Sequence, residues 1–405
     1  MDKLYFINSK VESNSVPFGS ILEETREKTV IENEDTLLSC AINGIYRNDE
    51  LFSHFRGSSN IGYIKIKKND LVLSAQNLHL GNANVNLRFE HGIISPAYKA
   101  YRVIGAVPEY MAQWVKRPQA NQFFLDATTE GASQCRKNID WDTLYAQNIQ
   151  LPSIEIQEKI ATLLSSVDTK IKVEKIKVEK LKAIKKSMLG KMFPKEGASV
   201  PEIRFKGFTD DWEQRKLGDI TVKIGSGKTP SGGKSAYVEN GIPLIRSQNV
   251  NGDKVDFADI VFIDEATDES MANSRVYTND VLLNITGASI GRSAVYKGLE
   301  SANVNQHVCI IRPTEGYQPD FIQLNLSSDN GQKQIDASQA GGGREGLNFQ
   351  EIGKMQFSFP SLNEQKYIGR YFNNFDNLIT LHQRKYEKLL DVKKAFLEKL
   401  IGGDN

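Results

Sequence analysis

A long segment of this chain occurs twice without a gap. Residues 151–193 align with residues 359–401, and every residue of the first copy lies 208 positions before its counterpart. The identical pairs include Pro152 and Pro360, Gln157 and Gln365, Asp168 and Asp376, and Leu181 and Leu389. A gapless repeat of this length predicts two copies of one structural unit, which any proposed fold has to accommodate.

Each copy has the spacing of a long amphipathic helix with a coiled-coil period. Apolar residues recur at alternating steps of four and three positions, as they do along the seam of a coiled coil. The seam positions are Ile160, Leu164, Val167, Ile171 and Leu181 in the first copy, and Ile368, Phe372, Phe375, Ile379, Leu389 and Phe396 in the second. Two seams with the same period are expected to bury against each other, in antiparallel helices if the chain consists of two tandem halves.

The predicted helices are long enough to act as spacers. Pro152 and Pro360 stand just before them, where a missing amide hydrogen is harmless, and Gly402 with Gly403 supplies a stop after the second helix. At a rise of 1.5 Å per residue, each helix forms a rod of about 50 Å. The alternative, two ordinary bundle helices within one globule, does not explain an exact duplication.

The segments between the helices are domain-sized. Residues 1–150 and 195–359 each fall within the usual range for one domain with its own core, so the predicted order is domain, helix (151–194), domain, helix (360–402). Short runs rich in branched and aromatic residues, typical of strands, occur at 62–75, 281–285, 307–311 and 355–359. We therefore predict an α+β fold in which two irregular globular domains are separated by a pair of long antiparallel coiled-coil helices.

The two domain segments also resemble each other. NDLVLSAQNLHLGNANV at residues 69–85 and NDVLLNITGASIGRSAV at residues 279–295 share the Asn-Asp pair, a following apolar run and a glycine at the same position. Together with the repeated helix, this similarity makes the whole chain a tandem duplication with a pseudo-twofold axis. The two domains would then be kept at a fixed distance from each other.

The composition excludes several classes of protein. Forty per cent apolar and 25% charged residues fit a globular chain with a core rather than a disordered one. The amino terminus has no basic start followed by an apolar stretch, and no segment approaches about 18 consecutive apolar residues, so we predict a cytoplasmic protein without a membrane span. Cys40, Cys135 and Cys309 are far apart and odd in number, which favours buried thiols over a disulfide framework or a zinc site.

The charge balance is nearly even. A formal net charge of +1 does not indicate a chain that binds nucleic acid alone, because neutralising phosphates takes an excess of Lys and Arg. The first repeated helix is an exception, with eight lysines from Lys170 to Lys186 and only Glu174 and Glu179 to offset them. This run is either a solvated helix face or a basic surface. If DNA is the ligand, partner proteins are expected to help bind it.

Several segments have the partial spacing of enzyme motifs. Gly227-Lys228-Thr229 resembles the end of a phosphate-binding loop. However, Val222 stands where that motif needs its first glycine, and Pro230 disfavours the helix that should follow. No two of the five histidines are four residues apart, and the Asn-Pro-Pro-Tyr or Asp-Pro-Pro-Tyr segment of adenine methyltransferases is missing from the sequence. We predict no catalytic residue, no metal and no cofactor bound by this chain itself.

Both domains carry polar residues of the types that read DNA bases. Arg forms two hydrogen bonds with guanine, and Gln or Asn does the same with adenine. In the second domain the candidates are Lys228, Thr229, Arg246, Ser247, Gln248, Asn249, Arg292, Asn305, Gln306 and Arg344. In the first domain they are Gln76, Asn77, His79, Lys99, Arg136 and Lys137. The same residue types are common in turns, where they satisfy backbone groups, so each single assignment has a structural alternative.

The order of these segments resembles the specificity subunit of type I restriction-modification enzymes. The similar segments are GIPLIRSQNV (241–250), NDVLLNITGASIGRSAVY (279–296), NQHVCIIRP (305–313) and PSLNEQKYIGRYFNNFD (360–376). The resemblance covers essentially the whole chain, and the second half is closer to the pattern. The first domain lacks the GSGKTP-like loop and the IRSQN segment, so its assignment as a target-recognition domain rests mostly on its position.

The resemblance implies DNA recognition without catalysis. Each domain would read one half of a split target in double-stranded DNA, and the helix pair would set the unread spacer. Half-sites one helical turn apart need recognition elements about 34–36 Å apart. Two modification subunits would dock on this chain and carry S-adenosylmethionine and adenine methylation, while restriction subunits would bring ATP, Mg and DNA cleavage. Candidate docking residues are Phe372, Tyr371 and Phe375.

Two other functions are compatible with parts of the sequence. A coiled-coil scaffold that joins two partner proteins would need no DNA and would show no sequence-dependent binding. A nucleotide-dependent enzyme would need Gly227-Lys228-Thr229 to bind phosphate, so that Lys228→Ala abolishes ATP binding. The order and duplication of the segments favour the specificity subunit.

Overall fold

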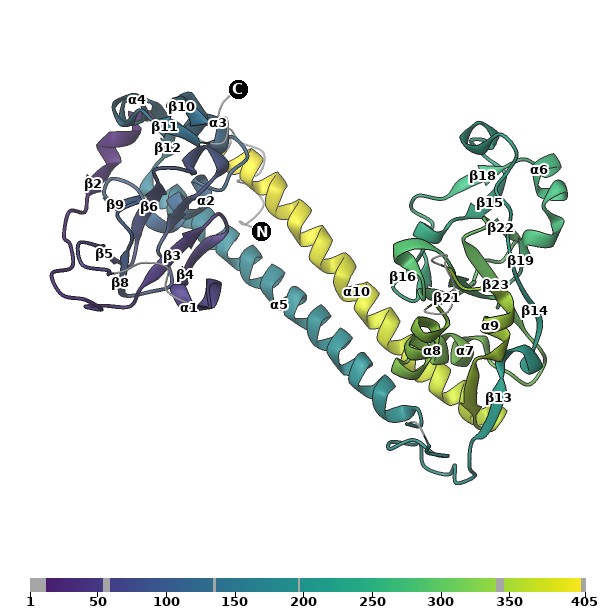
Figure 1. Cartoon of the computed structure of the whole chain (residues 1–405). Helices are drawn as coiled ribbons and strands as arrows, with labels where there is room; N and C mark the ends of the chain where they lie inside the picture. The colour runs from purple at the N-terminus through teal and green to yellow at the C-terminus, as the bar shows by residue number, and fades with distance from the viewer. Residues whose placement is uncertain (1–11, 54–58, 134–135, 196, 340–345, 402–405) are drawn as a thin grey trace. The chain divides into compact units, whose positions relative to one another are not determined.

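Two long helices of equal length connect the parts of this chain (Figure 1): α5 (Ile154–Met192) and α10 (Leu362–Leu400). The computed structural model describes residues 12–53, 59–133, 136–195, 197–339 and 346–401. The chain forms two units, the first made of Met1–Ile176 with Gln383–Asn405 and the second of Lys177–His382. Both helices pass from one unit into the other. The four-part division expected from the sequence stays a prediction.

The two long helices run antiparallel in each unit. In the first unit, Lys393 of α10 forms an ion pair with Asp168 of α5, with 2.6 Å between Nζ and Oδ1. In the second unit, Lys185 of α5 pairs with Asp376 of α10 at the same distance. The two ion pairs are equivalent in the repeat, because Asp168 and Asp376 are 208 positions apart, as are Lys185 and Lys393. The predicted antiparallel tandem repeat is confirmed.

The predicted seam residues are buried most where the helices meet the domain cores. Ile160 and Leu164 are at most 5% exposed and pack in the core of the first unit with Leu397 and Leu400. Phe372 is 1% exposed in the core of the second unit, together with Ile368. Val167 is also buried, while the other seam residues are only partly buried: Ile171, Leu181, Phe375, Ile379, Leu389 and Phe396. Two helices alone bury one face of each, so the domains supply the remaining cover.

The first unit contains a four-stranded antiparallel sheet in the order β2–β9–β6–β7. Its strands are β2 (Leu22–Glu24), β9 (Tyr98–Val103), β6 (Asp70–Ser74) and β7 (Ala83–Val85). Two-stranded sheets are β1 (Ser13–Pro17) with β12 (Asn148–Pro152), β3 (Leu38–Ala41) with β4 (Gly44–Arg47), β5 (Ile64–Lys67) with β8 (His91–Ile94), and β10 (Thr128–Ser133) with β11 (Arg136–Ile139). The helices are α1 (Asn48–Leu51), α2 (Pro108–Trp114), α3 (Ala120–Asp126) and α4 (Trp141–Ala146), with 3-10 turns η2 (Phe18–Ile21) and η3 (Leu78–Leu80).

The second unit contains two four-stranded sheets. One has the order β14 (Thr221–Ser226), β23 (Val308–Pro313), β20 (Val281–Asn284) and β21 (Ser293–Val295), and the other has β18 (Val261–Ile263), β15 (Ile242–Ile245), β22 (Ala302–Val304) and β19 (Arg275–Val276). Two-stranded sheets are β13 (Glu213–Lys216) with β24 (Gln356–Phe359), and β16 (Val250–Asn251) with β17 (Lys254–Val255). The helices are α6 (Glu265–Ser270), α7 (Pro319–Ser327), α8 (Asp329–Gln339) and α9 (Phe349–Lys354), with 3-10 turns η4 (Leu217–Ile220), η5 (Gly233–Ala236), η6 (Ser247–Asn249), η7 (Ala272–Ser274) and η8 (Gly287–Ser289).

The Asn-Asp turns noted in the sequence have the same structure in both units. Asn69 and Asn279 have φ of 74° and 75°, the left-handed conformation that asparagine tolerates better than most residues. The following aspartates accept hydrogen bonds from the backbone three residues earlier, Asp70 from Lys67 N–H and Asp280 from Tyr277 N–H. The two turns start β6 and β20, the central strands of equivalent sheets.

A repeated glutamine joins each long helix to its domain. Gln157 accepts a hydrogen bond from the Val107 N–H at 2.8 Å and donates to the carbonyl oxygen of Pro152. Gln365 accepts from the Gln318 N–H at 3.0 Å and donates to the carbonyl oxygen of Pro360. Each glutamine therefore links the first turn of α5 or α10 to the start of a proline-led domain helix, α2 or α7.

Candidate nucleic-acid interface

Two polar segments of the second unit emerge at the same edge of a sheet. Strands β15 and β22 are parallel, with Leu244 opposite Asn303 and Ile245 opposite Val304. Parallel strands end on the same side, so residues 246–249 after β15 and residues 305–307 after β22 lie next to each other. The Asn305 N–H donates a hydrogen bond to the Ile245 carbonyl oxygen at 3.1 Å, which fixes this arrangement.

A third segment reaches this edge from β20. The Ile285 N–H donates to the His307 carbonyl oxygen at 3.0 Å. One residue later, Thr286 Oγ1 and His307 Nδ1 are 2.6 Å apart. The amide of Asn284 donates to the Ser247 carbonyl oxygen at 2.8 Å, so the end of β20 is bonded to both segments already described.

The glycine-rich loop after β14 is the fourth segment. A Cβ atom on Gly227 would lie 1.7 Å from the carbonyl oxygen of Val304, so only glycine allows this close backbone approach. Lys228 and Thr229 follow directly, and both are exposed. The polar residues of these four adjacent segments form what we call the polar edge: Lys228, Thr229, Arg246, Ser247, Gln248, Thr286, Asn305, Gln306 and His307.

Two residues of the polar edge share one acidic partner. Nη2 of Arg246 donates hydrogen bonds to the carbonyl oxygen of Asp259 at 2.6 Å and to its carboxylate at 3.3 Å. The side-chain amide of Gln248 donates to the same carboxylate oxygen. No local sequence pattern indicates Asp259, because it lies more than ten residues after Arg246 and Gln248. Thr286 was also missed, although it lies in the segment NITGAS.

Asn249 has a structural role that corrects its prediction as a base-contacting residue. It is 2% exposed, and its Oδ1 accepts a hydrogen bond from the Arg246 N–H at 3.0 Å. Its amide donates to the carbonyl oxygens of Asp256 and Asp259 at 3.0 and 3.3 Å. Because both ends of this amide bond the backbone, Asn249 stabilises the loop, and we remove it from the candidate set.

The hairpin β16–β17 connects the segment after β15 to the long helices within the second unit. The Asp253 carboxylate in the hairpin turn lies 2.8 Å from Nζ of Lys185, which also pairs with Asp376. Lys254 donates to the carbonyl oxygen of Asp376 at 3.0 Å and to the Thr380 hydroxyl. Burial alone would lower the pKa of Lys185, but the two carboxylates outweigh it and raise this pKa above its ordinary value. The lysine therefore stays charged and holds the hairpin on α5 and α10.

The remaining candidates of the second unit lie elsewhere. Arg292 is exposed in the turn between η8 and β21, where it lines a cavity of about 470 Å³ together with Lys182 and Lys186 of α5. Arg344 lies outside the described residues. Their prediction as DNA contacts is not tested by these positions.

The first unit brings part of its candidates to the equivalent edge. The Ala75 N–H donates to the Ala97 carbonyl oxygen at 3.1 Å, which repeats the bond between Ile285 and His307. Gln76 and Asn77 are exposed after β6, and His79 is half-buried in η3. Lys137 lies half-buried on β11, while the side chain of Arg136 lies outside the described residues.

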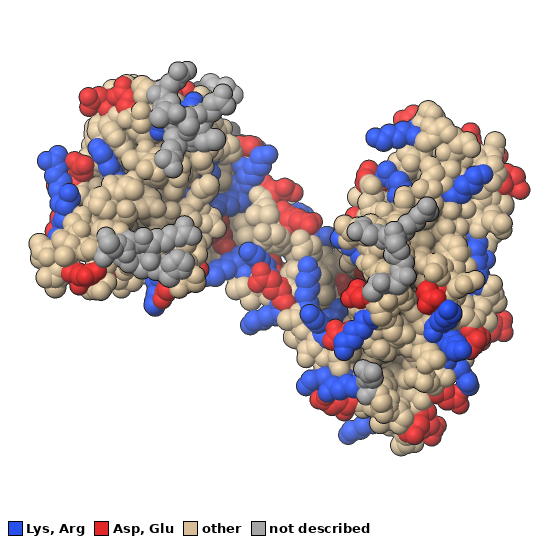
Figure 2. Space-filling model, viewed as in Figure 1, with Lys and Arg blue, Asp and Glu red and all other residues tan. Residues whose placement is uncertain are grey.

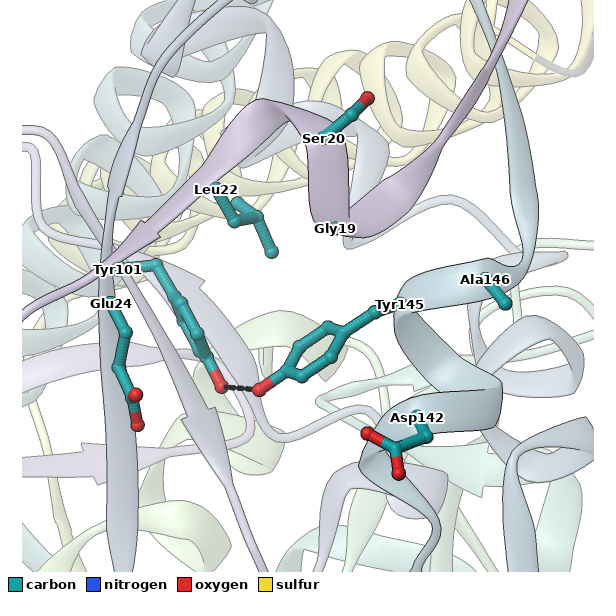
Figure 3. A pocket seen from close by; sticks show the side chains of 8 residues that line it. All are labelled: Gly19, Ser20, Leu22, Glu24, Tyr101, Asp142, Tyr145 and Ala146. Carbon is teal, nitrogen blue, oxygen red and sulfur yellow. Dashed lines mark hydrogen bonds between the residues drawn. The ribbon is translucent and has the colours of Figure 1, made fainter.

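Lys99, at the start of β9, is turned toward aromatic residues of its own unit. Its Nζ lies 4.2 Å from the centroid of the Trp141 ring and 3.8 Å from the Glu24 carboxylate. A cavity of about 500 Å³ nearby is lined by Glu24, Asp142 and two tyrosines, Tyr101 and Tyr145, whose hydroxyls are 2.6 Å apart (Figure 3). Burial raises the pKa of Tyr101, so its hydroxyl stays uncharged. Two carboxylates and neutral hydroxyls do not suit a phosphate group.

The described residues contain potential metal ligands and two buried cysteine thiols. No three His, Cys, Asp or Glu side chains in this part of the chain are arranged as metal ligands. Burial raises the pKa of the thiols of Cys40 and Cys309 to about 12, which leaves them protonated and unreactive. Within the same residues, no helix has the length and apolar character needed to cross a membrane. Figure 2 shows Lys and Arg interspersed with Asp and Glu over the face drawn.

The sequence is similar to a known domain family and to several known proteins. The family model for the type I restriction modification DNA specificity domain matches residues 209–391. The chain is 26% identical to the type I restriction enzyme MjaVIII specificity subunit of Methanocaldococcus jannaschii over 69% of this chain and 67% of that protein. It is also 26% identical to the putative MjaX specificity subunit of the same organism, over 47% of this chain and 45% of that one. A third relative, the EcoBI specificity subunit of Escherichia coli, is 32% identical over 33% of this chain and 28% of its own length.

Solved structures share the fold. The crystal structure of a type I restriction-modification system S subunit from M. genitalium superposes with a TM-score of 0.64 at 15% identity, over 98% of this chain and 97% of that one. A chain from a structure on complex assembly and conformational transition of the type I R-M system gives a TM-score of 0.52 at 15% identity, over 98% of this chain and all of that chain. The aligned sequence relatives are matched over 28% to 67% of their length, whereas the fold is matched almost end to end.

Proposed function

We propose that this chain is a specificity subunit of a type I restriction-modification system and reads a bipartite DNA target, because the model for the type I restriction modification DNA specificity domain matches residues 209–391. Each unit reads one half-site of the double-stranded target. The long helix pair sets the number of unread base pairs between the half-sites. The chain itself performs no chemistry and directs partner subunits to the target.

The observation that carries this proposal is the convergence of four separate segments at the polar edge. Arg246 and Gln248 are the residue types that form paired hydrogen bonds with guanine and adenine in the major groove. Lys228 beside them suits a phosphate, which fixes the position of a protein on DNA without reading sequence. The bond between Ala75 and Ala97 repeats the same edge in the first unit, as a second half-site requires.

The partners follow from the even charge balance and the surface of the long helices. A net charge of +1 supplies little of the phosphate neutralisation that DNA binding needs, so partners contribute it. Large apolar side chains are exposed on both helices, among them Leu163, Val173 and Leu390 in the first unit and Ile184, Leu378 and Leu381 in the second. We assign these to the docking of two modification subunits, one for each unit. The prediction that Phe372 contacts a partner is wrong, because this residue is 1% exposed within the core.

The chemistry belongs to the partners in this proposal. Modification subunits bind S-adenosylmethionine and methylate adenine, and restriction subunits use ATP and Mg to translocate and cleave DNA.

Mapping methylated adenines tests the function directly. Cells that produce this chain with its modification partner should methylate adenine in one bipartite sequence with a constant spacer. Cells with the modification partner alone are the control and should lack this methylation. Methylation without sequence preference, or none in the presence of both proteins, would contradict the proposal and favour a scaffold.

Replacing Arg246 by alanine should relax recognition at one base of the second half-site. Loss of a two-bond contact to guanine costs about 1–3 kcal/mol of discrimination, which is about 5- to 150-fold. The measurement is the methylation rate of duplexes that carry each of the four bases at every position of the target. Arg215→Ala, an exposed arginine on β13 outside the polar edge, is the matched control and should leave all positions unchanged.

Lengthening both long helices by one heptad should lengthen the spacer and leave the half-sites unchanged. Seven residues add about 10 Å of helix, which corresponds to about three base pairs of DNA. The insertions belong at equivalent positions, after Glu179 in α5 and after Glu387 in α10, to preserve the repeat. The methylated sequence of cells with this variant gives the new spacer. An unchanged spacer in an active variant would show that the helices do not set it.

A further inference from the structure

The loop that follows the hairpin β16–β17 returns to the polar edge. The Asp256 N–H donates to the Asn249 carbonyl oxygen at 2.7 Å, and the amide of Asn249 donates to the carbonyl oxygens of Asp256 and Asp259. Asn249 is buried, so these bonds are protected from water. The backbone of Asp259 is therefore fixed against the segment that contains Arg246 and Gln248.

Asp259 contacts both of these side chains while remaining open to solvent. Its side chain is 75% exposed, whereas that of Arg246 is 19% exposed. It bonds Arg246 through its carbonyl oxygen and its carboxylate, and it bonds the Gln248 amide through the same carboxylate oxygen. One acidic residue thus sets the orientation of two neighbouring side chains of different length.

These contacts use only part of the hydrogen-bonding capacity of Arg246. Both bonds to Asp259 come from Nη2, so they do not use the donors on Nη1. A free arginine side chain loses considerable rotamer entropy when it is ordered against a ligand, and a guanidinium that is already ordered by the protein loses less. A charged acceptor also makes a stronger hydrogen bond than a neutral one.

On the basis of the proposed function, we propose that Asp259 is a positioning residue for base recognition. It orders Arg246 and Gln248 before DNA binds, so that both read the second half-site from one fixed geometry. Its negative charge also repels phosphates, so it lowers the affinity for DNA that offers no partner to Arg246. Both effects increase specificity: the ordered side chains strengthen binding to the specific site, and the negative charge weakens binding to other DNA.

A competing role for Asp259 is less compatible with the structure. A carboxylate that merely occupied Arg246 until DNA arrived would have to leave when the base contact forms. The carbonyl oxygen of Asp259 cannot leave with it, because Asn249 fixes the backbone on both sides of the loop. The hydrogen bond from Arg246 to the Asp259 carbonyl oxygen therefore persists even when the carboxylate moves away.

The test uses the complex of this chain with its modification subunit and measures methylation of duplexes with every base at each target position. Asp259→Ala should lower discrimination about tenfold at the same positions as Arg246→Ala and Gln248→Ala. At the base position read by Arg246, the double variant Asp259→Ala with Arg246→Ala should discriminate no worse than Arg246→Ala alone, because a positioning residue has no effect there without the side chain that it positions. Asp259→Asn, which keeps a neutral acceptor, should recover part of the loss.

The matched control is Asp256→Ala, which removes the same charge from the same loop. The Asp256 carboxylate accepts a hydrogen bond from the Ala258 N–H and forms no hydrogen bond or ion pair with Arg246. It should leave discrimination unchanged, and thermal unfolding of each variant separates a folding defect from a recognition defect.

Three outcomes overturn the positioning role. Asp259→Ala with tighter binding and full discrimination would make Asp259 a competitor of DNA. A loss at a different base position that adds to that of Arg246→Ala would make it a base reader of its own. Unchanged discrimination in a folded variant would leave it without a role in recognition. If Arg246→Ala itself has no effect, the proposed function of the polar edge fails instead, which keeps the two failures apart.

Discussion

Arg204→Met should lower the free energy of unfolding of the second unit by about 3–5 kcal/mol. Arg204 forms two parallel hydrogen bonds with Glu364, from Nε at 2.7 Å and from Nη2 at 2.8 Å. The side chain of Glu364 is 1% exposed at the start of α10, so removal of the arginine leaves a buried carboxylate without its cation. Chemical denaturation of the full chain measures the loss.

Two further variants identify the cause of this loss. Arg204→Met combined with Glu364→Leu should recover most of the stability, because replacing a buried ion pair by apolar residues costs little. Arg215→Met breaks the pair with Glu213, in which both side chains are about half exposed or more, and should change stability by less than about 1 kcal/mol. A loss of less than about 1 kcal/mol for Arg204→Met as well would contradict the burial of an unpaired carboxylate as the cause.

Exchanging residues 195–359 for those of a family member with a different target should replace the second half-site completely and preserve the first. The reason is that all residues of the polar edge come from the second unit, between Lys228 and His307. Sequencing of methylated DNA from cells that carry the hybrid shows which half has changed. The reciprocal exchange of the first domain is the control and should change only the other half.

The donor segment must also contain residues equivalent to Arg204 and Asp253. Arg204 pairs with Glu364 of α10, and Asp253 pairs with Lys185 of α5. Both ion pairs therefore join a residue of the exchanged segment to a residue of the retained chain. A donor without an equivalent arginine and aspartate would leave Glu364 or Lys185 unpaired, and the hybrid would then fail by unfolding. A folded hybrid in which both half-sites change would contradict the division of recognition between the units.

The helical part of the fold could be predicted because its signal is local and periodic. Steps of four and three identified the seam, and the 208-residue offset predicted the equivalence of Asp168 and Asp376, which the structure confirms in two ion pairs. The extent of seam burial could not be predicted in the same way. Ile160 and Phe372 pack against domain residues that are distant in the sequence. The periodic pattern of the helix itself contains no information about such contacts.

The candidate site was predictable by residue type but not by geometry. The segment at 246–249 was recognisable as polar and positioned after a strand, yet its register against β22 depends on a parallel pairing between strands about 60 residues apart. Asn249 and Gln248 are adjacent and chemically alike, and only the structure shows that one is buried as a loop support while the other is exposed. Asp259 was missed because an acidic residue is an unusual member of a surface that binds a polyanion.

The equivalence of the two lysine–aspartate pairs has a consequence for the origin of the chain. Each long helix carries both kinds of partner, Asp168 and Lys185 on α5 and Asp376 and Lys393 on α10. Two copies of a helix with this pattern can form both ion pairs when they lie antiparallel to each other. Duplication and fusion of the gene for an ancestral homodimer would leave such a pattern, and each half could then diverge in the sequence that it recognises.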